Sequence, residues 1–128
     1  MAEKLKRAQG AKVWIFPDGD LPPAGEKEPF GHEAVMILNT SSKDARIEFD
    51  IYFEDKEPVL GIKDTVKAER VRCFRLDKPL GDKKFKIPFG QYAMRVRSDV
   101  PVIAQFGRLD VRQPNMAYYI NTGFFVQD

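Results

Sequence analysis

Apolar and polar residues alternate along one segment near the middle of the chain. Between Asp44 and Val59, apolar side chains occupy every second position from Ala45 to Phe53, and mostly charged side chains lie between them. A β-strand places successive side chains on opposite faces, whereas a helix would scatter these apolar residues around its surface. The alternation therefore predicts a strand with one buried face.

Other apolar and β-branched runs are bounded by Gly, Pro and short polar turns, as is typical of strands. They predict strands at residues 12–16, 33–39, 66–76, 91–97, 100–108 and 116–126. The strand at 45–53 is expected to pair with the one before it through the polar turn at 40–43. No long window shows helical periodicity. We therefore predict an all-β fold, an antiparallel β-sandwich of jelly-roll or immunoglobulin-like type with seven or eight strands.

The length of 128 residues is that of one domain. We expect residues 1–11 to form a charged, mobile extension and residues 12–128 to form a single sandwich domain. The extension lacks the apolar core of a signal peptide, and no segment approaches the roughly 20 apolar residues that span a bilayer. Cys73 is the only cysteine, which favours a cytoplasmic location, and we expect it to be a small buried hydrophobe. Direct insertion into a membrane is not expected.

The strand at 33–39 carries the run Ala-Val-Met-Ile-Leu at 34–38, which is apolar on both faces. A sandwich strand normally buries only one face against the core. We therefore expect the second face to meet another layer or a neighbouring subunit, and oligomerisation follows as a hypothesis.

His32 is the only histidine, and the next residue, Glu33, could orient its imidazole as a general base requires. However, the sequence contains no second histidine for a metal site and no nucleophile motif. Asp18 and Asp20 lack the further acids of an EF-hand loop. A structural role for His32 is therefore favoured, and no catalytic residue, metal or cofactor is predicted.

Trp14 precedes a loop that contains Asp18 and Asp20, so it could stack on a sugar ring while the carboxylates accept hydroxyl hydrogen bonds. Binding of a sugar or polyol is therefore an alternative function. The net charge of +2 and the absence of an aromatic RNA-reading motif argue against a nucleic-acid partner.

The densest polar cluster spans the end of the strand at 100–108 and the loop after it. Its members are Gln105, Arg108, Asp110, Arg112 and Gln113. Arg108, Asp110 and Arg112 recur at every second position, so in an extended chain they project the same way and can pair or bind a partner carboxylate. The cluster could be a ligand site or an ion-pair network between subunits.

Several short motifs, in this order, resemble the sensory rhodopsin transducer family of small soluble prokaryotic proteins. They run from about Lys12 to about Asn121. The matching pieces are Trp14, Asp18-Gly19, Leu21-Pro22-Pro23-x-Gly25, His32-Glu33, Ile37-Leu38-Asn39, Ile51-Tyr52-Phe53, Asp55-Lys56-Glu57-Pro58-Val59, Ser98-Asp99-Val100-Pro101-Val102, Gln105, Arg108-Leu109-Asp110-x-Arg112-Gln113.

The resemblance implies a β-sandwich protomer, a homotetramer and a non-enzymatic role in binding or signalling. It supplies no catalytic residues. Six residues match its recurrent polar positions and are site candidates: His32, Glu33, Arg108, Asp110, Arg112 and Gln113. The leading hypothesis is a cytoplasmic adaptor that binds a protein partner, either a membrane receptor or a soluble protein.

Overall fold

The computed structural model describes residues 7–127, which form eight strands and no helix. The strands are β1 (Ala11–Leu21), β2 (His32–Asn39), β3 (Ala45–Tyr52), β4 (Val59–Val66), β5 (Arg70–Arg75), β6 (Gly90–Asp110), β7 (Ala117–Asn121) and β8 (Phe124–Val126). All their pairings are antiparallel, which confirms the predicted all-β class. The expectation for residues 1–6 of the N-terminal extension lies outside the described residues.

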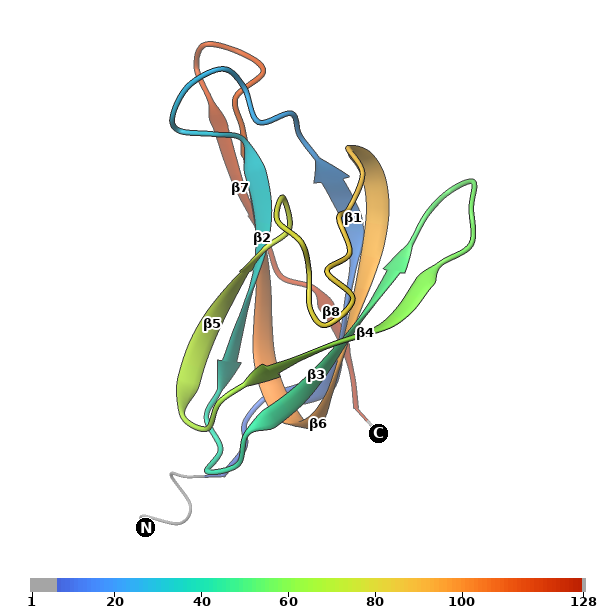
Figure 1. The fold of residues 1–128 in the computed structure, drawn as a ribbon. Coiled ribbons are helices and arrows are strands. Elements are labelled where there is room, and N and C mark those ends of the chain that lie inside the picture. Colours follow the sequence, from blue (N-terminus) through green and yellow to red (C-terminus); the bar gives the residue numbers. More distant parts are fainter. Residues whose placement is uncertain (1–6, 128) are drawn as a thin grey trace.

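Two sheets share the long strand β6 (Figure 1). Sheet A has the order β4-β3-β6-β1-β8, and sheet B has the order β5-β2-β6-β7. The first arm of β6 pairs with β1 and β3; the chain then turns back near residues 98–101, and the second arm pairs with β2 and β7. The two strands predicted at 91–97 and 100–108 are therefore one bent strand that joins the sheets.

The core lies between the two sheets. The Phe16 and Phe106 rings stack with centroids 5.4 Å apart, and the Phe49 and Phe74 rings meet edge to face at 5.0 Å. Each pair joins sheet A to sheet B, so the sheets pack face to face. The alternation in β3 is confirmed by four buried side chains: Ala45, Ile47, Phe49 and Ile51.

The expected hairpin between β2 and β3 is wrong. β2 pairs with β5 and β6, whereas β3 pairs with β4 and β6. The connection crosses from one sheet to the other and is held by the buried Asn39, whose Nδ2 donates to the carbonyls of Lys43 and Val66. These hydrogen bonds satisfy backbone groups that a hairpin ladder would otherwise have paired.

Three of the predicted strands have other bounds in the structure, and β4 was not predicted apart from its last residue, Val66. β1 continues beyond Phe16 to Leu21 because a bulge between Phe16 and Gly19 accommodates Pro17. The segment 66–76 contains only the end of β4 and all of β5, separated by a turn in which Glu69 has a φ of 54°. The segment 116–126 is divided into β7 and β8, which pair with strands of different sheets.

Cys73 is exposed, so the expectation of a buried thiol is wrong. Its neighbour Phe74 points into the core, and the alternation of β5 therefore turns Cys73 to the outer face of sheet B, opposite Met36. Within residues 7–127, no helix has the length and apolarity to cross a membrane.

Candidate functional site

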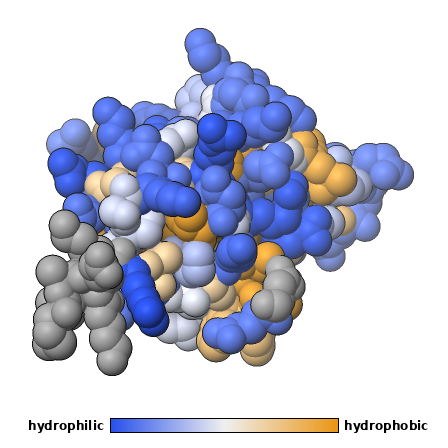
Figure 2. Space-filling model, turned by 90° about the horizontal axis from the view of Figure 1, so that it is seen from below, coloured by the Kyte–Doolittle hydropathy of each residue, from blue (hydrophilic) through white to orange (hydrophobic). Residues whose placement is uncertain are grey.

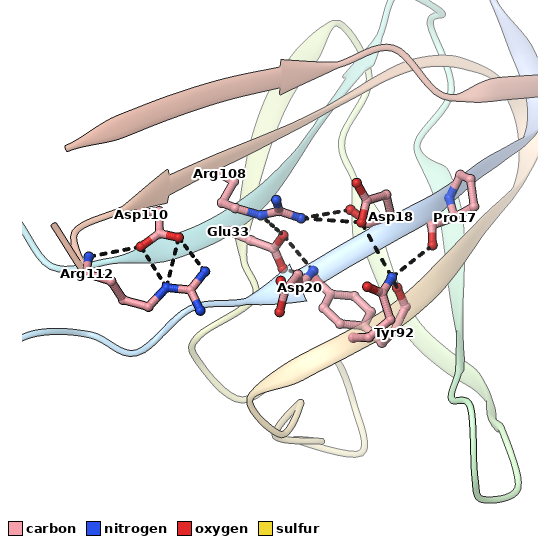
Figure 3. Close-up of polar contacts among 9 residues, drawn as sticks. Pro17, Asp18, Asp20, Glu33, Tyr92, Arg108, Asp110 and Arg112 are labelled. Carbon is pink, nitrogen blue, oxygen red and sulfur yellow. Dashed lines mark hydrogen bonds and ion pairs between the residues drawn. The ribbon is translucent and has the colours of Figure 1, made fainter. Parts of the chain in front are cut away.

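A fully buried carboxylate, Glu33, lies at one end of the sandwich (Figure 3). Arg108 Nε donates to Glu33 Oε2 at 2.9 Å, and the Tyr92 hydroxyl donates to Glu33 Oε1 at 2.6 Å. The backbone N–H of Asp20 donates to Oε2 at 3.0 Å. The donors come from β1 and from both arms of β6, so this cluster ties the two sheets together.

Strand alternation explains why these side chains meet. Glu33 is on the same face of β2 as the buried Val35 and Ile37, and Arg108 is its antiparallel partner on β6. Tyr92 opposes Gly19 across the β1–β6 ladder. A Cβ at Gly19 would lie 2.6 Å from the Tyr92 ring, so only glycine leaves room for the tyrosine.

The donors offset the cost of burying a carboxylate, which is large for an unpaired charge. Burial raises the pKa of Tyr92, and the charge of Glu33 raises it further, so the phenol stays protonated and donates. Burial alone would lower the pKa of Arg108, but the hydrogen bond and charge of Glu33 raise it above its ordinary value. The site therefore holds a fixed ion pair with a neutral tyrosine.

At its solvent side, the ion pair continues into an exposed group of charges. Arg108 Nη2 donates to the backbone carbonyl of Asp18 at 3.0 Å. The same nitrogen lies 3.8 Å from Oδ1 of the Asp18 side chain. Arg112 and Asp110 form an exposed ion pair; the hydrogen bonds from Arg112, together with the charge of Arg108, lower the pKa of Asp110. We refer to Asp18, Asp20, Glu33, Arg108, Asp110 and Arg112 as the acidic end, because four carboxylates meet two guanidinium groups.

The structure brings together four of the predicted site residues, namely Glu33, Arg108, Asp110 and Arg112. Arg112 pairs with Asp110, as the spacing suggested, but Arg108 pairs with Glu33 instead. Gln105 lies elsewhere, exposed on the outer face of sheet B opposite Met36. Gln113 is exposed in the loop after β6.

His32 and Glu33 face opposite sides of β2, so Glu33 does not orient the imidazole. His32 Nδ1 instead lies 2.8 Å from the carbonyl oxygen of Phe30. The ring lines a separate pocket of about 500 Å³ together with Glu28, Phe30 and Arg75. Within residues 7–127, no three His, Cys, Asp or Glu side chains are grouped to hold a metal ion.

Trp14 does not lie with Asp18 and Asp20. Its Nε1 donates to the Val102 carbonyl at 2.8 Å, and its ring packs against Phe125 with centroids 5.4 Å apart. The two aspartates follow it along β1 by roughly 13 to 20 Å at the usual rise of a strand. This arrangement does not favour a joint sugar platform, and sugar or polyol binding stays a prediction.

Tyr92 is a site residue that was not predicted from the sequence. The alternation of its strand could have shown that Tyr92 is buried, because it lies on the apolar face with Met94 and Val96, all of them buried. A buried tyrosine hydroxyl normally has a hydrogen-bond partner. The identity of that partner was not accessible, since Glu33 is 59 positions away in the chain.

A family model and a solved structure name the same family. The family model described as Anabaena sensory rhodopsin transducer matches residues 9–125. The solved structure of the Anabaena sensory rhodopsin transducer is 38% identical, with a TM-score of 0.71, and the match covers 84% of this chain and 96% of that one.

The crystal structure of Thermotoga maritima 1070 is 31% identical, with a TM-score of 0.82, over 93% of this chain and 97% of that one. Among curated proteins, no relative matches. The family model spans most of the chain, and the solved structures share both its fold and a substantial part of its sequence. This chain belongs to the Anabaena sensory rhodopsin transducer family.

Proposed function

We propose that this transducer-like protein is a non-enzymatic adaptor in the cytoplasm, which assembles as a homotetramer and relays a signal by binding a protein partner. The observation that carries the proposal is the apolar outer face of sheet B. The acidic end, at the far end of the same molecule from the turn of β6, offers a separate surface for the partner (Figure 1).

The outer face of sheet B presents apolar side chains from four adjacent strands. Leu38 lies in register between Val71 on β5 and Ile103 on β6, and β7 adds Tyr118 and Ile120. These five side chains are between 38% and 65% exposed. No layer of residues 7–127 covers this face, and monomeric proteins rarely expose an apolar patch that extends over several strands. The patch therefore suits contact with a second copy of the chain.

A tetramer built from twofold contacts needs two different interfaces. The outer face of sheet B supplies the first. The second is assigned to the short edge strand β8, where Phe124 is 73% exposed and Phe125 is 55% exposed. Such an edge carries both apolar side chains and unpaired backbone groups, which a neighbouring subunit can bury and pair.

Replacing Ile103 by Lys is expected to dissociate the assembly, because the charge would have to be desolvated within the apolar patch. Light scattering should show a lower mass for the variant than for the parent protein at the same micromolar concentration. The matched control is Thr65→Lys, an exposed strand position on the outer face of sheet A, which should leave the mass unchanged. An unchanged mass for Ile103→Lys would contradict the assignment of this face.

The charge of the acidic end indicates the kind of partner. Cytoplasmic segments of membrane proteins carry an excess of Lys and Arg near their membrane spans. Asp18 and Asp20 at the acidic end are complementary to such a segment, and Asp18 is 71% exposed at its side chain. A relative is named as a sensory rhodopsin transducer, and we extend that role to this chain through contact with the basic cytoplasmic face of such a receptor.

The double variant Asp18→Asn with Asp20→Asn is expected to weaken binding to proteoliposomes that carry a microbial sensory rhodopsin, by about tenfold. The loss should decrease as salt concentration rises, because salt screens the contact. The control variant Glu54→Gln with Glu57→Gln removes the same charge from the exposed loop between β3 and β4 and should bind as the parent does. Equal binding by all three proteins, or no binding by any, would overturn the receptor contact.

A further inference from the structure

The outer face of sheet A contains a groove of about 820 Å³, at the opposite end of the molecule from the acidic end. Its walls come from the start of β1, the start of β3, the end of β4 and the turn of β6. The residues that carry charge in these walls are Lys12, Arg46, Glu48, Lys63, Asp64, Arg97 and Asp99. This volume is in the range of sites that hold small ligands. Figure 2 views the molecule from this end, where hydrophilic side chains cover most of the visible surface.

Each carboxylate of the groove already accepts a hydrogen bond within the protein. Glu48 accepts a hydrogen bond from Arg97 at 2.9 Å, and Asp64 accepts from Arg72 outside the groove. Asp99 accepts from the backbone N–H of Arg46 at 2.8 Å. Two of the three carboxylates are therefore neutralised by arginines, and Asp99 is the one that forms no ion pair within residues 7–127.

Most basic side chains of the groove have fewer partners than its carboxylates. Within the part of the chain that the structure describes, Lys12, Arg46 and Lys63 form no ion pair. Thr65, an exposed residue, also lines the groove, and its hydroxyl can donate to a ligand oxygen. The groove thus offers uncommitted donors, three of them positively charged, to an incoming acceptor.

One guanidinium in the groove is held in place by two carboxylates of the neighbouring strand. Arg97 donates through Nε and Nη2 to both oxygens of Asp50, which is fully buried, and through Nη1 to Glu48. Each of its terminal nitrogens carries a second N–H. A fixed guanidinium of this kind loses little side-chain entropy when it binds an oxyanion.

We propose that this groove binds small ligands that carry phosphate or carboxylate groups, with Lys12, Arg46, Lys63 and Arg97 as the charged donors. The ligand chemistry follows from the excess of uncommitted cationic donors over uncommitted carboxylates. Through this site the protein would bind a small molecule at a place separate from both the assembly face on sheet B and the acidic end.

Isothermal titration calorimetry at low salt, with glucose 6-phosphate and citrate as probes and glucose as the uncharged control, tests the site. The two anions should bind, and glucose should not. The variant Lys12→Gln with Lys63→Gln should weaken anion binding by about tenfold or more, because each charge-assisted hydrogen bond is strong. Neither lysine forms an ion pair with another residue between 7 and 127, so the variant should keep the thermal stability of the parent protein.

The control variant Lys78→Gln with Lys86→Gln removes the same net charge from exposed positions in the connection between β5 and β6, and should bind the anions as the parent does. Equal weakening in both double variants would assign the effect to overall charge and overturn the site. Binding of glucose as tight as that of glucose 6-phosphate, or no heat from either anion, would also overturn it. Receptor binding and oligomeric mass do not enter these readouts, so the outcome is separate from that of the proposed function.

Discussion

Replacing Arg108 by Ala is expected to lower the free energy of unfolding by about 3 to 5 kcal/mol. The change leaves the Glu33 carboxylate fully buried and without its cation. Tyr92 and the backbone N–H of Asp20 would still donate to it, but neither carries a compensating charge. Urea unfolding followed by circular dichroism measures the loss.

The comparison variant is Arg112→Ala, which breaks an exposed ion pair with Asp110 and should lower the free energy of unfolding far less, because solvent screens such a pair. If Arg108→Ala fails to fold, Tyr92→Phe keeps the ring that packs beside Gly19 and removes only the hydroxyl, at an expected cost of about 1 to 3 kcal/mol. A cost for Arg108→Ala or Tyr92→Phe no larger than that for Arg112→Ala would contradict the role assigned to the buried cluster.

The second large effect is expected at Asp50, whose fully buried side chain faces outward from sheet A. Arg95 and Arg97 each donate to Asp50 Oδ2 at 2.8 Å, and the backbone N–H of Gly61 donates to Oδ1 at 2.9 Å. Burial opposes ionisation, but these hydrogen bonds and the charge of Arg97 lower the pKa of Asp50 to about 2. Asp50 therefore stays ionised in the folded protein well below its ordinary pKa.

Asp50→Asn is expected to lower the free energy of unfolding at neutral pH by about 2 kcal/mol. Because the folded pKa lies below the unfolded value, the stabilisation is complete above about pH 4 and disappears as the pH falls towards 2. The stability of the parent protein and that of the variant should therefore converge over this range. Denaturant titrations at several acidic pH values measure the convergence, and a constant difference between the two proteins would contradict this account of Asp50.

The strands that could be predicted from the sequence are those whose signal is local. The alternation from Ala45 to Phe53 predicted β3 because one face of that strand meets the core. The pairing of β3 with β6 could not be predicted in the same way, since it depends on packing between segments that lie far apart in the chain. The bend in β6 was also hidden, because residues 98–101 resemble an ordinary turn between two strands.

The candidate site was predictable only in part, for the same reason. The spacing of Asp110 and Arg112 indicated an ion pair, which the structure contains. Asp50 occupied a position that the alternation assigns to solvent, yet two arginines of the neighbouring strand enclose it. Whether a polar side chain of a strand is solvated or paired depends on the adjacent strand, and the sequence of one strand does not contain that information.

The mass of the protein in solution tests the central claim most directly. Static light scattering over a dilution series in the micromolar range should give about 59 kDa, four times the 14.7 kDa of the single chain. That result would support an adaptor that assembles through the apolar outer face of sheet B. A mass of 14.7 kDa at every concentration would contradict it, because the exposed face would then have no partner copy in solution.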